Sequence, residues 1–398
     1  MKRKKLLFVT DVFPYPLDRG QRVRVSHLLE ACAKKFAVTL VAPRISADAM
    51  ARVPACVSEA VLFDANGQGG VDLRLVHKAM GMGIGLPIGR NLPQRIQILR
   101  ALKGLDLAQF DLIWAERPHV ALLFHDQRSR TLVDFDDIEH LKLMRSKQLQ
   151  KPFLDRLSGW YKFRLYRRAE LFAFQHYLRI VVCSEDDESY LSRQGAGRVL
   201  VAPNGVAVPP VLAARPAREA GTPLRLVFLG NMTHEPNIDA VRFFADHVLP
   251  LTRGTVDGLD VIGPNASQEL IQQYSGRVRF RGFVDDLAIA LSQYDAMVAP
   301  IRFGSGTKLK VLDAMANGLP LVSTPCGAEG LRIADNVHVL VASTAEEFAA
   351  ALARLDQSCE LAVRLRQSAY ALAQEQFSWD AINDTLSDRL EGIAHSLE

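Results

Sequence analysis

The chain has 398 residues, of which 48% are hydrophobic and 23% are charged, and its formal net charge is +4 at pH 7. This length exceeds one ordinary hydrophobic core and indicates two domains of typical size. The composition is typical of a globular protein, and so small a net charge excludes a dedicated nucleic-acid binder.

The cysteines and the apolar runs of the sequence indicate where in the cell the protein is located. Five cysteines are scattered along the chain and none forms a C-x-x-C pair, which argues against a disulfide framework or a zinc site and favours a reducing compartment. The apolar run after the basic start, Leu6–Thr10, has the length of one strand. No run reaches the roughly 18 apolar residues of a membrane span. We therefore expect a cytoplasmic protein that is soluble or lies on a membrane surface.

Short apolar runs separated by amphipathic stretches fill the first half of the chain. Each run ends at polar, proline or glycine residues, as buried parallel strands do. The stretch Val23–Lys35 has the apolar spacing of a helix. This alternation predicts a doubly wound α/β sheet. The predicted strands are Leu6–Thr10, Val38–Ala42, Ala60–Phe63, Leu112–Ala115, Thr131–Phe135, Ile180–Cys183 and Val199–Ala202.

The same alternation restarts after a proline-rich segment without periodicity, residues 207–221, which we interpret as a linker. We therefore predict two Rossmann-like domains, 1–206 and 222–376, that face each other across a ligand-binding cleft. The predicted strands of the second domain are Leu224–Leu229, Leu259–Ile262, Val278–Phe280, Ala296–Ala299, Leu319–Ser323 and Val337–Val341.

Residues 299–323 carry the most informative pattern, which predicts a strand, a glycine-rich turn, a helix, a Gly-Leu-Pro turn and a strand. Gly304 and Gly306 let the backbone approach a ligand closely, and the free N–H groups of the following helix point to the same place. Such a turn suits a phosphate.

Helical geometry then places Gly306, Lys310 and Asp313 on one face. An amine and a carboxylate one turn apart can bind a phosphate and a pair of ribose hydroxyls. A surface ion pair beside a structural turn explains the same residues. Lys308 lies on the other flank and ranks below Lys310.

Residues 304–323 resemble the signature helix of the family 4 glycosyltransferases, which are retaining enzymes with the glycosyltransferase-B fold. Their usual pattern is Glu-x7-Glu ahead of Ala-Met-Ala-x-Gly-x-Pro-Val-Val. Here Asp313 takes the place of the second Glu, and Ser305 stands where the first would be, in a branch with Gly-x-Gly-Thr-Lys-x-Lys. The resemblance implies a nucleotide-sugar donor bound by Gly304, Ser305, Gly306, Thr307, Lys308, Lys310 and Asp313.

Two further turns agree with this resemblance. Gly230 and Asn231 follow the first strand of the second domain, where the family often has Arg and Lys for the diphosphate, and Lys310 is the candidate substitute. Gly282 and Phe283 resemble the turn that lies against the nucleotide base. We expect all four turn residues to bind the donor.

The resemblance extends to both ends of the chain. Gly20 stands where the family has a glycine close to the donor phosphates, although a plain Pro/Asp/Gly turn explains it structurally. Residues 377–398 resemble the final helix that crosses back to the N-terminal domain in this fold.

Residues 134–139 place four acids at the end of a predicted strand that faces the cleft. A buried acid pair raises its own pKa and can act as a base or orient an acceptor hydroxyl, and we assign this catalytic role to Asp136 or Asp137 beside Lys310. A helix N-cap cluster explains the same acids. They also resemble the metal-binding D-x-D of A-type transferases, which two Rossmann-like halves argue against. Glu116 is a weaker candidate.

Residues 145–179 hold nine Lys and Arg but two acids, with aromatic residues interleaved, among them Trp160, Tyr161, Phe163, Tyr166, Phe172 and Phe174. A basic aromatic helix can lie on the inner surface of an anionic membrane. A core helix with inward aromatics and a solvated Arg face explains the same sequence.

These patterns and the resemblance together predict a retaining glycosyltransferase of hexosyltransferase type that needs no metal and no cofactor. It would move a sugar from a nucleotide-diphosphate donor to a saccharide or lipid-linked saccharide, in surface or exopolysaccharide synthesis. No nucleic-acid partner is expected. A non-catalytic nucleotide-sugar-binding protein and a nucleotide-sugar epimerase of the same fold remain alternatives.

Overall fold

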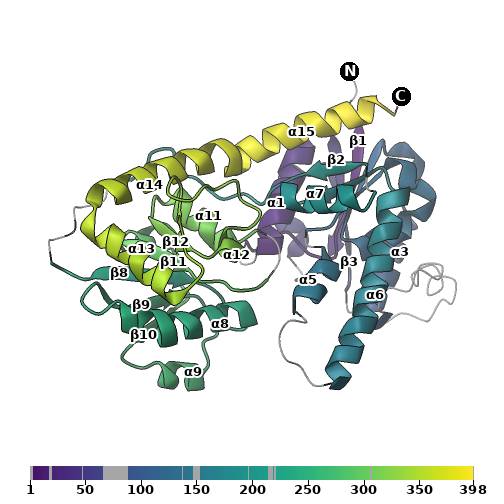
Figure 1. Ribbon diagram of the computed structural model, residues 1–398. Coiled ribbons are helices and arrows are strands. Elements are labelled where there is room, and N and C mark those ends of the chain that lie inside the picture. Colours follow the sequence, from purple (N-terminus) through teal and green to yellow (C-terminus); the bar gives the residue numbers. More distant parts are fainter. Residues whose placement is uncertain are drawn as a thin grey trace. The chain divides into compact units, whose positions relative to one another are not determined.

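The computed structural model describes most of the chain in two compact units (Figure 1). The first unit comprises Met1–Asn204 with Ile382–Glu398, and the second comprises Gly205–Ala381. The described residues are 3–17, 20–46, 48–65, 88–136, 138–146, 153–195, 197–213, 218, 221–304 and 307–397.

The first unit is built on a seven-stranded sheet in the order β3-β2-β1-β4-β5-β6-β7, and every neighbouring pair is parallel. The seven strands predicted in the first half are confirmed. Their bounds are β1 (Lys5–Val9), β2 (Ala37–Pro43), β3 (Glu59–Phe63), β4 (Leu112–Glu116), β5 (Thr131–Asp134), β6 (Arg179–Val182) and β7 (Val199–Val201).

Both faces of this sheet are covered, which explains why its strands are continuous apolar runs. Alternate residues of β1 enter different cores, with Leu7 and Val9 on one face and Leu6 and Phe8 on the other. The first core includes residues of α3 and α6, and the second includes residues of α1. The helices are α1 (Gly20–Lys35), α3 (Ile88–Leu102), α4 (Pro118–Ala121), α5 (Glu139–Ser146), α6 (Phe153–His176) and α7 (Glu185–Arg193). Three 3-10 turns are η1 (Ala49–Arg52), η2 (Leu107–Gln109) and η3 (Leu122–Arg130).

The second unit repeats this plan with a six-stranded parallel sheet in the order β10-β9-β8-β11-β12-β13. Its last strand is shorter than predicted, because the segment from Val337 lies in a turn before β13 begins. The strands are β8 (Leu224–Leu229), β9 (Val256–Ile262), β10 (Val278–Gly282), β11 (Ala296–Ala299), β12 (Leu321–Ser323) and β13 (Leu340–Val341).

Two apolar cores also cover the faces of this second sheet. The helix that follows β8, α8, continues into a π-helical turn. The helices are α8 (Glu235–Phe243), α9 (Gln268–Gln273), α10 (Leu287–Leu291), α11 (Leu309–Ala316), α12 (Pro325–Ala328), α13 (Ala345–Gln357) and α14 (Cys359–Leu372). The π-helical turns are η4 (Phe244–Val248) and η6 (Ala373–Phe377), and η5 (Leu249–Leu251) is a 3-10 turn.

The last helix, α15 (Trp379–His395), belongs to both units. Its first three residues lie in the second unit, and from Ile382 onward it lies in the first. Leu386, Leu390 and Ala394 are buried in the core that contains α1. Among the residues that the structure describes, no helix has the length and apolar character needed to cross a bilayer.

Candidate active site

The strand order of the second unit reverses between β8 and β11. From β8 the chain runs outward to β9 and β10, then returns to β11 on the other side of β8. In open α/β sheets, ligands bind outside the carboxyl ends of the strands at such a switch point. The turns after β8 and β11 carry most of the residues that the resemblance assigns to the donor.

Lys310 is the central cation of this switch point. Its Nζ donates a hydrogen bond to Asn237 Oδ1 at 2.6 Å and lies 4.2 Å from the centroid of the Phe228 ring. Burial, assisted by the like charge of Lys308, lowers the pKa of Lys310 to about 7. Lys310 is therefore not a surface residue, as the alternative of a surface ion pair requires, because Phe228 of β8 and Asn237 of α8 contact its side chain.

A chain of amides continues from Lys310. Asn237 donates from Nδ2 to the Asn231 carbonyl at 2.9 Å, and Asn231 Oδ1 accepts from Asn265 Nδ2 at 3.1 Å. Gly230 leaves room for this packing, since a Cβ there would lie 2.8 Å from Asn237 Cγ. The predicted residues Gly230 and Asn231 are thus brought together with Lys310.

The glycine-rich turn after β11 lies beside the start of α8. Gly304 has a φ of 135°, which favours glycine, and a Cβ there would lie 3.7 Å from Lys308 Cε and 4.0 Å from Pro236 Cγ. Ser305 and Gly306 lie outside the described residues. The buried hydroxyl of Thr307 has no hydrogen-bond partner within the described part of the chain.

Helix α11 starts later than the sequence predicts. Its first residue is Leu309 and its N-cap is Lys308. The predicted face shared with Gly306 cannot be followed, because Gly306 lies outside the described residues. Lys310 and Asp313 still lie one turn apart. Burial raises the pKa of Asp313 to about 7, against the opposing charge of Lys310.

The turn after β10 presents an aromatic ring. Gly282 has a φ of 73°, and its carbonyl accepts a hydrogen bond from the Gly263 amide at 2.8 Å. The next side chain, Phe283, is 71% exposed. An exposed ring on a turn held by backbone bonding can stack against a planar group.

The first unit has its own switch point between β1 and β4, where the buried group is Glu116. Its carboxylate accepts hydrogen bonds from the Thr10 hydroxyl and, at 2.8 Å, from Gln21 Nε2. Burial and the nearby charge of Asp11 raise its pKa to about 7, although Arg117 opposes them. Gly20, the residue before Gln21, begins α1.

An acid and a histidine lie at the same strand ends. His119 Nε2 is 3.0 Å from Asp11 Oδ2, while the buried Asp11 Oδ1 has no hydrogen-bond partner among the described residues. Burial disfavours the ionised Asp11, but His119 outweighs it and lowers the pKa of the carboxyl. Asp11 and His119 are not among the site residues predicted from the sequence, in which Glu116 is a weaker candidate. The sequence signal for these residues was their position at or just after the ends of the predicted strands.

In the described part of the acid cluster after β5, two acids lie against one arginine. Asp134 is buried against Arg24, whose Nη2 and Nε lie 2.9 and 3.1 Å from its two carboxylate oxygens. Asp136 lies 3.7 Å from the same guanidinium and accepts a weak hydrogen bond from Cys183 Sγ at 3.5 Å. Asp137 lies outside the described residues.

The remaining members of that cluster have structural partners. Glu139 begins α5, and its amide donates to Glu170 Oε1 at 2.9 Å. His140 pairs with the buried Glu170 through Nδ1 and lies 2.7 Å from the Tyr190 hydroxyl through Nε2. Within the described ranges, no three His, Cys, Asp or Glu side chains are grouped to hold a metal ion.

Comparison with known proteins supports a glycosyltransferase. The family described as "Glycosyl transferases group 1" matches residues 223–358, which lie in the second unit. Sucrose-phosphate synthase from Thermosynechococcus elongatus is similar in structure, with 16% identity and a TM-score of 0.72 over 99% of this chain and 100% of that one.

Two other solved structures extend the similarity. HepE from Anabaena in complex with UDP and glucose has 12% identity and a TM-score of 0.65, over 98% of this chain and 99% of that one. WaaG, a glycosyltransferase involved in lipopolysaccharide biosynthesis, has 16% identity and a TM-score of 0.65 over 97% and 100%. No curated protein sequence matches the chain. These similarities show the two-domain, Rossmann-like fold of the B-type glycosyltransferases.

Proposed function

We propose that this protein is a retaining glycosyltransferase that moves a hexose from a nucleotide diphosphate to a saccharide or lipid-linked saccharide. We assign the donor to the switch point of the second unit and the acceptor to that of the first. We further propose that it acts in the cytoplasm, without a metal or another cofactor, in surface or exopolysaccharide synthesis. The family match supports glycosyl transfer, and the resemblance around Asp313 supports the retaining mode.

The observation that carries this proposal is the position of Lys310. Its amine lies at the strand-order reversal beside a glycine turn and the amides of Asn231 and Asn237. Amine and amide N–H groups are suitable donors to phosphate oxygens. A diphosphate is the ligand whose charge and hydrogen-bond capacity match this set.

The lowered pKa of Lys310 is consistent with a site that binds an anion. Near pH 7 the free amine exchanges between its neutral and charged forms. A diphosphate bound within hydrogen-bond distance favours the charged form, so binding takes up a proton. The charged amine then stabilises the negative charge that grows on the departing diphosphate.

UDP is the first nucleotide to test. Solved structures of HepE hold UDP or UDP-glucose, and Phe283 offers an exposed ring on which a base can stack. We assign Asp313, one helical turn from Lys310, to the ribose hydroxyls, from which a carboxylate can accept hydrogen bonds.

The acceptor assignment rests on the carboxylates of the first unit. Glu116 and Asp11 lie at the carboxyl ends of β4 and β1, and Asp11 retains an unused buried oxygen among the described residues. Carboxylate oxygens accept hydrogen bonds from sugar hydroxyls. This set is suited to orienting a saccharide.

The test combines binding and turnover on the full chain. Thermal shifts with UDP, GDP, ADP and their sugar conjugates identify the donor, because ligand binding raises apparent stability. Incubation of that donor with candidate saccharides then measures transfer. Binding without transfer or hydrolysis would favour a non-catalytic protein, and sugar isomerisation without an acceptor would favour an epimerase. No binding of any nucleotide would refute the proposal.

A further inference from the structure

Helix α6 has a buried face and a solvent-exposed face that differ in charge. Ala169, Glu170, Ala173 and Phe174 are buried. Glu170 is the only acid between residues 159 and 176, and it is paired with His140 inside the first unit. The solvent-facing side of this stretch therefore carries no acid.

Most exposed side chains of the same stretch are cationic or aromatic. Trp160 is 50% exposed and Tyr161 is 62% exposed. The exposed cations are Lys162, Arg164, Arg167 and Arg168. This arrangement corrects the alternative in which the aromatics all pack inward, since Trp160 and Tyr161 face solvent together with the charges.

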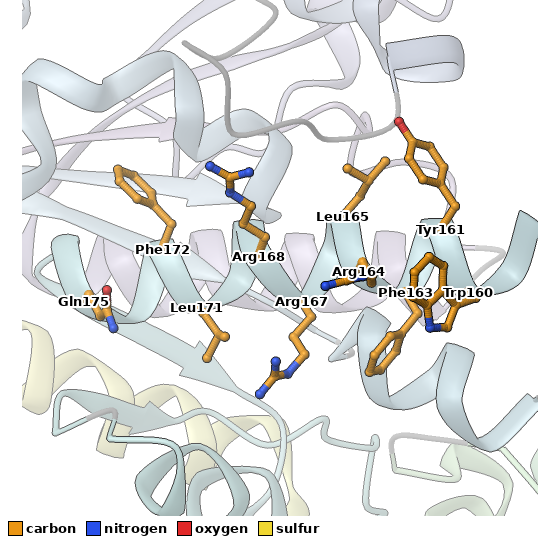
Figure 2. A pocket seen from close by; sticks show the side chains of 10 residues that line it. All are labelled: Trp160, Tyr161, Phe163, Arg164, Leu165, Arg167, Arg168, Leu171, Phe172 and Gln175. Carbon is orange, nitrogen blue, oxygen red and sulfur yellow. The ribbon is translucent and has the colours of Figure 1, made fainter.

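Aromatic and basic side chains alternate along the helix. Figure 2 shows one row formed by Tyr161, Leu165, Arg168 and Phe172, and an opposite row formed by Trp160, Phe163, Arg167 and Leu171. Arg164 lies between these rows, with its guanidinium carbon 4.6 Å from the centroid of the Trp160 ring. The side chains line a groove of about 1220 Å³.

We propose that this face of α6 is a docking surface for an anionic phospholipid bilayer. Trp and Tyr favour the boundary between headgroups and acyl chains, where an amphipathic ring contacts both. Lys and Arg bind anionic headgroups while their aliphatic stems cover apolar surface. The absence of an exposed acid on residues 159–176 removes the repulsion that would oppose such contact. This proposal does not depend on the proposed transferase activity.

The charge part of the proposal is tested by vesicle cosedimentation of the full chain. The vesicles contain phosphatidylcholine alone or equal parts of phosphatidylcholine and phosphatidylglycerol. The wild type should bind the anionic vesicles preferentially, and less at about 1 M than at about 0.1 M salt. Each basic residue strengthens such binding about fivefold, so Arg164→Glu with Arg168→Glu should weaken it at least about 25-fold.

A matched variant changes the same charge elsewhere. Arg253→Glu with Arg364→Glu replaces two exposed arginines of the second unit and should weaken vesicle binding far less. Circular dichroism and the thermal transition of each variant establish that it is folded. An equal loss in both double variants would overturn the proposal, because net charge alone would then explain the binding.

The aromatic part has a separate readout. Trp160→Ala with Tyr161→Ala removes exposed rings and should abolish the binding that persists at high salt, while the salt-dependent part remains. A wild-type protein that ignores both vesicle types would overturn the proposal. So would retention on nucleic acid without retention on anionic vesicles, which would indicate a nucleic-acid surface instead.

Discussion

The two units have the same strand order around their central strands, but the side chains at the point where that order reverses are acidic in the first unit and carry an amide and an amine in the second. In the first unit, β1 and β4 end in the carboxylates of Asp11 and Glu116. In the second, β8 and β11 lead to the amide of Asn231 and the amine of Lys310. The sheet fixes where a ligand can bind, and the side chains decide whether it presents hydroxyls or phosphates.

Burial acts on both sites in opposite directions. It raises the pKa of Glu116 to about 7 and lowers the pKa of Lys310 to about 7, because each loses hydration of its charged form. The pKa of an acid and the pKa of an amine are thereby brought to about the same value, one by an increase and the other by a decrease. Both can change protonation when a ligand arrives near neutral pH.

The largest expected effect is on the cationic site. Lys310→Ala should lower the transfer rate about 100-fold, or about 3 kcal/mol, since one donor to the leaving diphosphate is lost. Lys308→Ala is the matched control and should cost far less. Steady-state kinetics measures both. Near-normal turnover in a folded Lys310→Ala protein would remove this amine from the mechanism.

The second effect is a pH dependence of nucleotide binding. Because the pKa of Lys310 is about 7 in the free protein, the amine loses its proton above pH 7 and binding must restore it. UDP affinity should fall about tenfold between pH 7 and pH 8.5. Calorimetry in two buffers of different ionisation enthalpy measures the proton uptake.

Asp313 titrates in the same range, so the pH experiment is repeated with Asp313→Asn. The proton uptake should persist in that variant and disappear in Lys310→Ala. Uptake that disappears only with Asp313→Asn would assign the titration to the carboxyl.

The third effect concerns the acidic site. Glu116→Gln preserves the shape of the side chain but removes the charge, so kcat/KM for the acceptor should fall about tenfold. Its pH profile near 7 should flatten, while UDP affinity stays unchanged. A parallel loss of UDP affinity would mean that the acids of the first unit contribute to the donor site.

The smallest effect is expected at Asp313. Asp313→Ala should weaken UDP binding about fivefold, the scale of one lost hydrogen bond to a ribose hydroxyl. Asp313→Glu should be tolerated, since the resembling family carries Glu there. Unchanged affinity in the alanine variant, measured by calorimetry, would restrict Asp313 to a structural role.

Much of the fold was predictable because buried parallel strands are apolar along their whole length. The runs around Leu6 and Leu224 therefore identify β1 and β8 without knowledge of their neighbours. The glycine turn at Gly304 was equally visible, since it lies within one strand-turn-helix segment.

The environment of each charged side chain was not predictable, because its partners are distant in sequence. Lys310 is covered by Asn237, 73 positions earlier, and Asp134 is neutralised by Arg24, 110 positions earlier. From the neighbouring residues in the sequence alone, Lys310 and Asp134 would both be interpreted as unpaired charges. For the same reason, the burial of Glu116 beside Thr10 and Gln21 could not be predicted.

The route of the chain through α15 has a consequence for synthesis. Translation proceeds from the N-terminus, yet the first unit's core lacks Leu386, Leu390 and Ala394 until that segment has been synthesised. The second unit, Gly205–Ala381, is contiguous and has all its residues before then. We therefore expect the unit that is made first to finish folding last. A stop codon just after Ala381 would therefore expose apolar core residues of the first unit, which is encoded at the other end of the gene.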